Sequence, residues 1–104
     1  MTESGFVGFV TKNSTLRAPF VTRNGSGVPS APDATPTYEI YSGDYSGVLA
    51  SGNLAAVSGA ATGVYSIAAA TTDGGYAAGS TYGGVVKWAV SSTNYSQAFT
   101  FSVV

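Results

Sequence analysis

The sequence predicts an all-β fold, an immunoglobulin-like antiparallel β-sandwich with an N-terminal arm. Apolar residues do not recur at helical spacing in any window that is free of glycine and proline, whereas apolar and polar residues alternate repeatedly between turn-forming residues. The 104 residues are enough for one domain with its own core. Several short strands joined by such turns are typical of a sandwich, and a small open barrel is the alternative.

Three strands are predicted in the first half of the body. Residues 16–21 alternate, and Pro19 marks this strand as an edge strand because proline cannot donate a hydrogen bond to a neighbour. The proline-punctuated stretch VPSAPDATP, residues 28–36, is suited to a crossing between sheets. Alternation resumes over residues 37–41, and SGDYSG then predicts a hairpin to a strand over residues 48–54.

Three further strands are predicted in the second half. Residues 64–69 alternate, and so do residues 82–90, in which Val86 and Trp88 share one face and are therefore expected in the core. The polar turn SSTN then leads into a last strand, in which three apolar residues alternate with polar ones: Phe99, Phe101 and Val103.

Residues 1–13 stand apart from the body, which we place at residues 14–104. This segment carries an apolar patch made of Phe6, Val7, Phe9 and Val10. An additional edge strand and an arm that packs on a partner both agree with this composition. Because two phenylalanines are too apolar for a free tail, we expect the segment to be buried against something in either case.

Charged residues are scarce and unevenly distributed. They make up 9% of the chain, against about 25% in ordinary soluble domains. A surface of serine, threonine, asparagine and glycine is easily covered by a neighbour, which favours a subunit of an assembly over a free secreted domain. Residues 1–23 hold three cations against Glu3, and the remainder holds four carboxylates against Lys87. Spaced cations do not form the basic face that nucleic acids require, so we expect the arm to dock on an acidic protein surface.

No targeting or membrane segment is expected. The start, MTESGFVGFV, has an acidic residue where a signal peptide has basic ones, and its apolar run is short. No apolar run approaches the roughly 18 residues that a membrane helix needs. The chain has no cysteine, so disulfides and thiolate metal sites are excluded and the compartment stays open.

We expect neither catalysis nor a cofactor nor a metal. The chain has no histidine, so the commonest general base and the usual activator of a serine hydroxyl are missing. Neither lysine follows a serine at S-x-x-K spacing. The carboxylates lie on separate turns or on an outward strand face, and we expect two of them, Asp33 and Asp73, to bond nearby backbone N–H groups.

The stretch TTDGGYAAGSTYGGVVKWAV, residues 71–90, combines glycines with aromatic residues. A phosphate-binding loop would require a helix after the glycines, and here a strand follows. A sugar-binding platform is conceivable, but use of the aromatic residues in the core or at a protein interface is favoured. Four tyrosines are expected on outward faces or turns: Tyr41, Tyr45, Tyr76 and Tyr95.

Several of these stretches together resemble small immunoglobulin-like structural proteins of tailed bacteriophages. They are APDATPTYEIYSGDYSGVLASG, GVYSIAAATTDGGYAAGSTYGGVVKWAV and the phenylalanine-rich terminal strand, so that the resemblance covers about residues 28–104. In that group a proline-rich entry leads to a strand of the type PTYEIY, and a GxY strand is followed by a GYxxGxxY turn. Residues 1–27 resemble the group least.

The resemblance implies a non-enzymatic virion component. The role it fits best is a capsid decoration (cement) protein on the outer surface of the capsid, bound to the lattice of the major capsid protein. Such proteins are often trimeric, so we expect a homo-oligomer with a trimer favoured, and no nucleic acid or membrane as partner. The alternatives are an immunoglobulin-like module of the tail, neck or fibre, and, from a different class, a carbohydrate-binding module.

Five residues are predicted to bind the partner. Phe6 and Phe9 are the expected apolar anchors of the arm. Arg17 and Arg23 are expected to pair with acidic groups of the capsid, because a guanidinium can bind a carboxylate through two hydrogen bonds. Tyr76 is expected at the exposed tip of the glycine-rich stretch.

Overall fold

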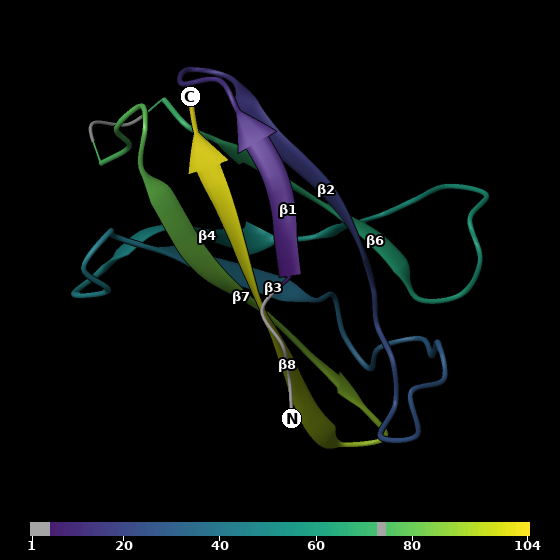
Figure 1. The fold of residues 1–104 in the computed structure, drawn as a ribbon. Helices are drawn as coiled ribbons and strands as arrows, with labels where there is room; N and C mark the ends of the chain where they lie inside the picture. Colours follow the sequence, from purple (N-terminus) through teal and green to yellow (C-terminus); the bar gives the residue numbers. More distant parts are fainter. Residues whose placement is uncertain (1–4, 73–74) are drawn as a thin grey trace.

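The computed structural model describes residues 5–72 and 75–104, and within them the chain forms strands and no helix. The strands are β1 (Gly5–Val10), β2 (Thr15–Val21), β3 (Thr37–Tyr41), β4 (Val48–Asn53), β5 (Ala55–Ala56), β6 (Val64–Ala70), β7 (Thr81–Val90) and β8 (Thr93–Val103). They form a five-stranded sheet in the order β1-β8-β7-β3-β4 and a three-stranded sheet in the order β2-β6-β5 (Figure 1). The predicted all-β class is confirmed, with two sheets consistent with a β-sandwich.

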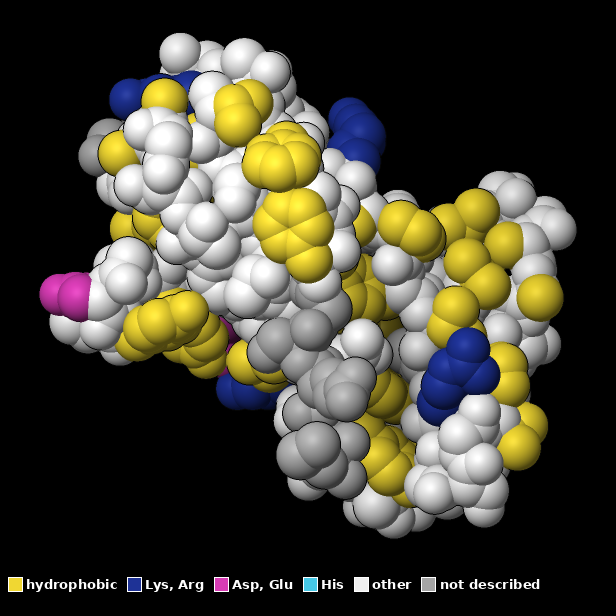
Figure 2. Space-filling model, viewed as in Figure 1, with side chains coloured by type: hydrophobic (Ala, Val, Ile, Leu, Met, Phe, Trp, Pro, Cys, Tyr) yellow, Lys and Arg dark blue, Asp and Glu magenta, His cyan; other side chains and the backbone are white. Residues whose placement is uncertain are grey.

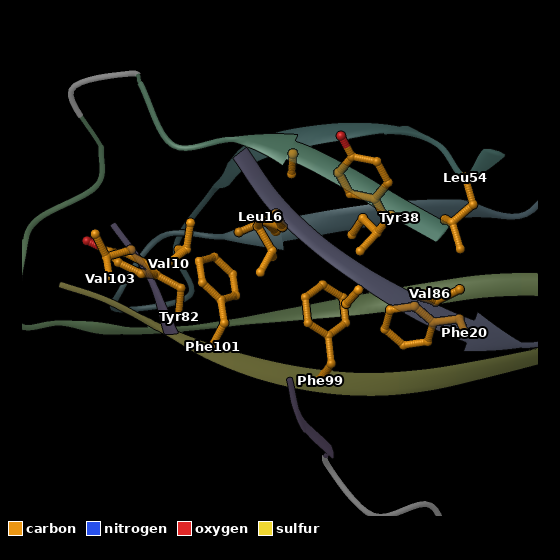
Figure 3. Close-up of a cluster of buried hydrophobic side chains, with 14 of the residues drawn as sticks. Val10, Leu16, Phe20, Tyr38, Leu54, Tyr82, Val86, Phe99, Phe101 and Val103 are labelled. Carbon is orange, nitrogen blue, oxygen red and sulfur yellow. The ribbon is translucent and has the colours of Figure 1, made fainter. Parts of the chain in front are cut away.

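The core lies between the two sheets, and both contribute to it through every second residue. On β2 the buried and exposed residues alternate strictly, so that Leu16, Ala18 and Phe20 face inward. The ring of Phe20 meets that of Phe99 edge-on across the interior, with centroids 5.5 Å apart. Figure 3 shows side chains from both sheets pointing into this shared interior. Burial of this apolar surface is the main favourable term in folding.

Two connections lie where the sequence predicts them. β2 is an edge strand of the three-stranded sheet, as Pro19 indicates, and pairs only with β6. The chain then passes to the other sheet through residues 28–36, and β3 and β4 form an antiparallel hairpin. The proline-rich stretch therefore carries the crossing between sheets.

The turn between β7 and β8 is shorter than predicted. β8 already begins at Thr93, because Ser91 and Ser92 adopt positive φ angles of 50° and 66°, the conformation of a two-residue hairpin turn. Their backbone N–H groups donate to the carboxylate of Asp33 at 3.0 and 2.8 Å. Asp33 therefore fixes a distant turn, and the prediction that it bonds nearby backbone groups is wrong. Asp73 lies outside the described residues.

β1 is an edge strand of the five-stranded sheet, and β4 forms the opposite edge. β1 runs parallel to β8 (Figure 1), with Gly5 opposite Phe99 and Val10 opposite Val103. After the strand ends, Lys12 N–H donates to the carbonyl of Val104 at 3.0 Å, and Val104 N–H donates to the carbonyl of Val10 at 2.9 Å. The first and last strands thus hold each other along one edge of the molecule.

Candidate partner-binding face

β1 has the sequence GFVGFV, a repeated tripeptide. Its phenylalanines lie on one face of the sheet and its valines on the other. In a regular strand two residues three positions apart point to opposite faces. Here the pairing with β8 shifts between Phe6 and Phe9, and Gly8 has a φ of 116° that favours glycine. Phe6 lies opposite Thr100 and Phe9 opposite Ser102, so both rings are on the outer face of the sheet. Val10 is buried in the core instead.

The two phenylalanines form an exposed aromatic pair. Their rings meet edge-on, with centroids 5.3 Å apart, and 54% of Phe6 and 72% of Phe9 are exposed. Figure 2 shows hydrophobic side chains gathered over the front of the molecule where β1 runs. Exposed apolar area costs about 25 cal/mol per Å² relative to its burial, so this pair provides a driving force for association.

Tyr45 adds a second aromatic group to the same outer face. It sits in the β3–β4 turn with a φ of 60° and is 64% exposed. Its ring lies over Gly83 of β7, where an added Cβ would stand 2.8 Å from the Tyr45 hydroxyl oxygen. Tyr41 is half-buried beside it, with ring centroids 6.3 Å apart. The tyrosines border a groove of about 280 Å³ that also runs over Val85, Ala98 and Thr100.

Successive glycines of β7 each make room for an aromatic ring, on opposite faces of the sheet. Gly83 admits Tyr45 on the outside, whereas an added Cβ on Gly84 would overlap the Phe99 ring on the inside. The pair GG inside a strand-like run is the sequence signal for such a close approach. The signal does not reveal which aromatic residues approach.

Hydrogen bonds of Asp44 hold the turn that carries Tyr45. The carboxylate accepts from the Ser46 hydroxyl at 2.7 Å, from the Ser46 N–H at 3.0 Å and from the Ser42 hydroxyl at 2.8 Å. These bonds, led by that of the Ser46 hydroxyl, lower the pKa of Asp44 from 3.8 to about 2. The lowered pKa reflects how strongly these hydrogen bonds favour the ionised carboxylate, which in turn stabilises the β3–β4 turn.

The outer face of the five-stranded sheet carries almost no charge. Within its strands the charged residues are Glu39 and Lys87, which form an ion pair at 2.6 Å. The hydrogen bond to Glu39 raises the pKa of Lys87. Since both side chains are partly exposed, the pair adds little stability. It does leave the strands of this face without net charge, and the ionised Asp44 in the β3–β4 turn lies at the border of the face.

Both predicted arginines lie away from this face. Arg17 is exposed on β2, on the outward side of the three-stranded sheet. Arg23 follows β2 and donates from Nη1 to the carbonyl of Gly27 at 3.0 Å. The structure therefore brings Phe6 and Phe9 together but does not bring the arginines to them.

Tyr76 is buried, and the prediction of an exposed tip is wrong. Only 2% of it is exposed, and its ring meets those of Tyr82 and Phe101 at centroid distances of 5.2 and 6.4 Å. The turn folds back over the end of the core, because Gly79 N–H donates to the carbonyl of Val103 at 2.6 Å. Tyr76 therefore packs in the core and cannot contact a partner.

No group of three or more metal-ligating side chains occurs among residues 5–72 and 75–104. The same residues contain no helix that is long and apolar enough to span a membrane.

Comparison with known proteins gave no match: neither a protein family, nor a curated protein, nor a solved structure resembles the chain significantly.

Proposed function

We propose that the two sheets form an immunoglobulin-like sandwich. In that fold strands C, F and G form one sheet, extended by C′ in variable-type domains, and strands B, E and D lie in the other. The orders β8-β7-β3-β4 and β2-β6-β5 correspond to G-F-C-C′ and B-E-D. β1 then pairs with the G strand. The disulfide and the tryptophan on strand C of antibody domains have no counterpart, because the chain has no cysteine and Trp88 lies on β7.

A tyrosine corner supports this assignment. In immunoglobulin-like domains a tyrosine near the start of strand F bonds through its hydroxyl to the backbone a few residues upstream. Tyr82 is the second residue of β7, and its hydroxyl donates to the carbonyl of Gly75 at 3.2 Å and accepts from Ala77 N–H at 2.7 Å. The motif GYAAGSTY, on which the resemblance to phage proteins partly depends, is this corner.

As for function, we propose a non-enzymatic capsid decoration protein that binds the lattice of the major capsid protein and stabilises the phage head. The observation that carries the proposal is the exposed pair Phe6 and Phe9 on an outer face whose strands carry no net charge. An edge strand could also recruit a partner by strand addition, but the bulge at Gly8 breaks the regular ladder. Docking through the face is therefore favoured. The resemblance supports the capsid as partner and a homo-oligomer, with a trimer favoured.

Co-sedimentation tests this proposal. The purified chain is mixed with expanded capsids, and separately with tails, of the phage that encodes it. We expect the wild-type chain to sediment with capsids and the double variant Phe6→Ser/Phe9→Ser to remain in solution. Val28→Ser is the matched control, because Val28 is 53% exposed but lies in the loop after β2.

Two results would contradict the proposal in different ways. Binding to tails without binding to capsids would replace decoration by the tail, neck or fibre alternative. Capsid binding that survives the double substitution would show that the partner uses another surface.

A further inference from the structure

In the described part of the chain the two sheets end in four edge strands, and three of these are protected against pairing with another chain. β1 and β4 border the five-stranded sheet, and β2 and β5 border the three-stranded sheet. A free edge offers unpaired backbone N–H and C=O groups, and proteins protect such edges with bulges, prolines, charges or very short strands. β1 carries the bulge at Gly8, and β5 has only two residues. The backbone of β2 and β4 decides what the other two edges offer.

β2 presents a proline and an arginine to its free side. Thr22 N–H donates to the carbonyl of Gly63 at 2.9 Å, in register with the β2–β6 pairing. Because hydrogen-bonded and non-hydrogen-bonded pairs alternate along an antiparallel ladder, the backbone groups of Arg17 and Pro19 point away from β6. Pro19 therefore removes a donor from the free edge itself, and Arg17 adds a charge there.

β4 has neither of these protections. Leu54 N–H donates to the carbonyl of Pro36 at 2.9 Å, one step beyond the pairing of Asn53 with β3. By the same alternation, the backbone groups of Ser51 and Asn53 point away from β3, to the free side. The strand, VLASGN, contains no proline and no charged residue. Its irregular pairing is confined to the end next to the turn, so residues 50–53 form a regular edge.

We propose that β4 pairs antiparallel with β4 of a second copy of this chain, about a twofold axis at Ser51. An antiparallel edge is self-complementary, because the axis brings the free N–H and C=O groups of one copy opposite the free C=O and N–H groups of the other. Ser51 is the outward-facing residue nearest the middle of the regular edge. The absence of charge on β4 lets two copies meet without repulsion. Val48, which is 49% exposed, adds apolar surface that the pairing would cover.

This pairing would join the two five-stranded sheets into one continuous sheet. Because the twofold axis is normal to the sheet, the outer faces of both copies lie on the same side, and two Phe6–Phe9 pairs face in one direction. The inference does not rest on the proposed function, since it uses the edge opposite β1 and needs no capsid. The resemblance to phage proteins favours a trimer, whereas a twofold axis requires a dimer.

Sedimentation velocity of the purified chain over a concentration series tests the proposal. We expect the wild type to form a dimer that dissociates on dilution. Ser51→Pro should weaken dimerisation by about tenfold or more, because the two hydrogen bonds across the axis are lost. Ser51→Lys should act in the same direction, because it places like charges directly opposite each other. Ser51 is exposed and its N–H points away from β3, so both variants should fold. Thr15→Lys is the matched control on β2 and should dimerise as the wild type does.

Cross-linking tests the position of the axis. The chain has no cysteine, so a single introduced thiol reports on one position. Residues in a hydrogen-bonded antiparallel pair have Cα atoms about 5.5 Å apart, within the range of about 4.4–6.8 Å that disulfides span. Ser51→Cys should therefore oxidise to a covalent dimer, whereas Thr15→Cys should not.

Three results would overturn the proposal. The first is a wild-type chain that sediments as a monomer or a trimer. The second is a dimer that Ser51→Pro and Ser51→Lys weaken no more than Thr15→Lys does, which would place the contact on another surface. The third is a covalent dimer that forms as readily from Thr15→Cys as from Ser51→Cys.

Discussion

The corner at residues 75–82 and strand β1 combine the same ingredients, glycine and aromatic residues, with opposite results. The corner turns Tyr76 and Tyr82 inward until 2% and 4% of them are exposed. β1 turns Phe6 and Phe9 outward, although phenylalanine is the more apolar residue. Each segment depends on a glycine with positive φ, Gly79 at 90° and Gly8 at 116°.

This contrast separates structural aromatic residues from those available to a partner. Tyr82 has what burial requires, since its hydroxyl is hydrogen-bonded, and both corner rings pack on Phe101. The β1 phenylalanines could have been buried by a regular strand, at least one of them, but the bulge places both outside. Exposing two apolar rings lowers the stability of the free chain, and this free energy would be recovered only when a partner buries the rings.

Deleting one ring from each segment should produce the largest difference. Tyr76→Ala removes a fully buried ring, and we expect it to destabilise the chain by about 3–5 kcal/mol. Phe9→Ala removes an exposed ring and should change the free energy of unfolding by less than about 1 kcal/mol. Urea unfolding followed by Trp88 fluorescence measures both. Equal destabilisation would mean that Phe9 is part of the core and would remove the contrast.

The corner hydrogen bonds provide the next largest effect. Tyr82→Phe keeps the ring but removes the hydroxyl that accepts from Ala77 N–H, which should cost about 1–2 kcal/mol. Tyr45→Phe is the control, because that hydroxyl makes no hydrogen bond to another described residue and the ring is exposed. Amide hydrogen exchange should accelerate at Ala77 in the first variant only. Unchanged exchange there would argue against a tyrosine corner.

The sequence predicts the strands well because alternation and turn residues are local signals. β3, β6 and β7 lie within a residue or so of their predicted ranges, and Pro19 places β2 at an edge. The burial of Tyr76 could not be predicted in this way, because it depends on Phe101, which lies far away in the sequence. The sequence shows that an aromatic residue lies in the turn, but the exposure of that residue depends on the distant contacts that close the turn.

The candidate sites were less accessible to prediction for the same reason. The apolarity of Phe6 and Phe9 predicts that they are buried against something, but composition agrees equally with a strand and an arm, and only the pairing with β8 shows the strand. The stacking of Trp88 on Tyr95 depends on the two-residue turn at Ser91 and Ser92, which sets the register of β8. Asp33 stabilises that turn from another part of the chain, and no local sequence pattern predicts this contact.

A substitution at the bulge should show whether Gly8 sets the outward position of the two rings or only carries backbone strain. Gly8→Ala meets no atom within 4 Å, so its cost is the positive φ alone, which is at least about 1 kcal/mol because a φ of 116° lies outside the left-handed region that alanine can reach. Gly27→Ala is a matched control with a φ of 77° and equally open space. Both should lose stability, Gly8→Ala the more because its φ is further from the left-handed region, but only Gly8→Ala should abolish the Phe6–Phe9 ring contact, measured by nuclear Overhauser effects. If that contact survives, the bulge does not set the outward position of the rings.

The smallest expected effect concerns the turn that adds Tyr45 to the outer face, which is held by a charge rather than by a glycine. The pKa of Asp44 is about 2 in the folded chain, against an ordinary value of 3.8. Because the folded-state pKa is depressed, the stabilisation is fully present above about pH 4 and is lost as the pH falls toward 2. The carboxyl-carbon chemical shift of Asp44 should titrate near pH 2, and in Ser46→Ala, which removes the strongest of its hydrogen bonds, the midpoint should move up toward 3.8. A wild-type midpoint already at 3.8 would show that the turn is open in solution, and Tyr45 would then have no fixed place beside Gly83.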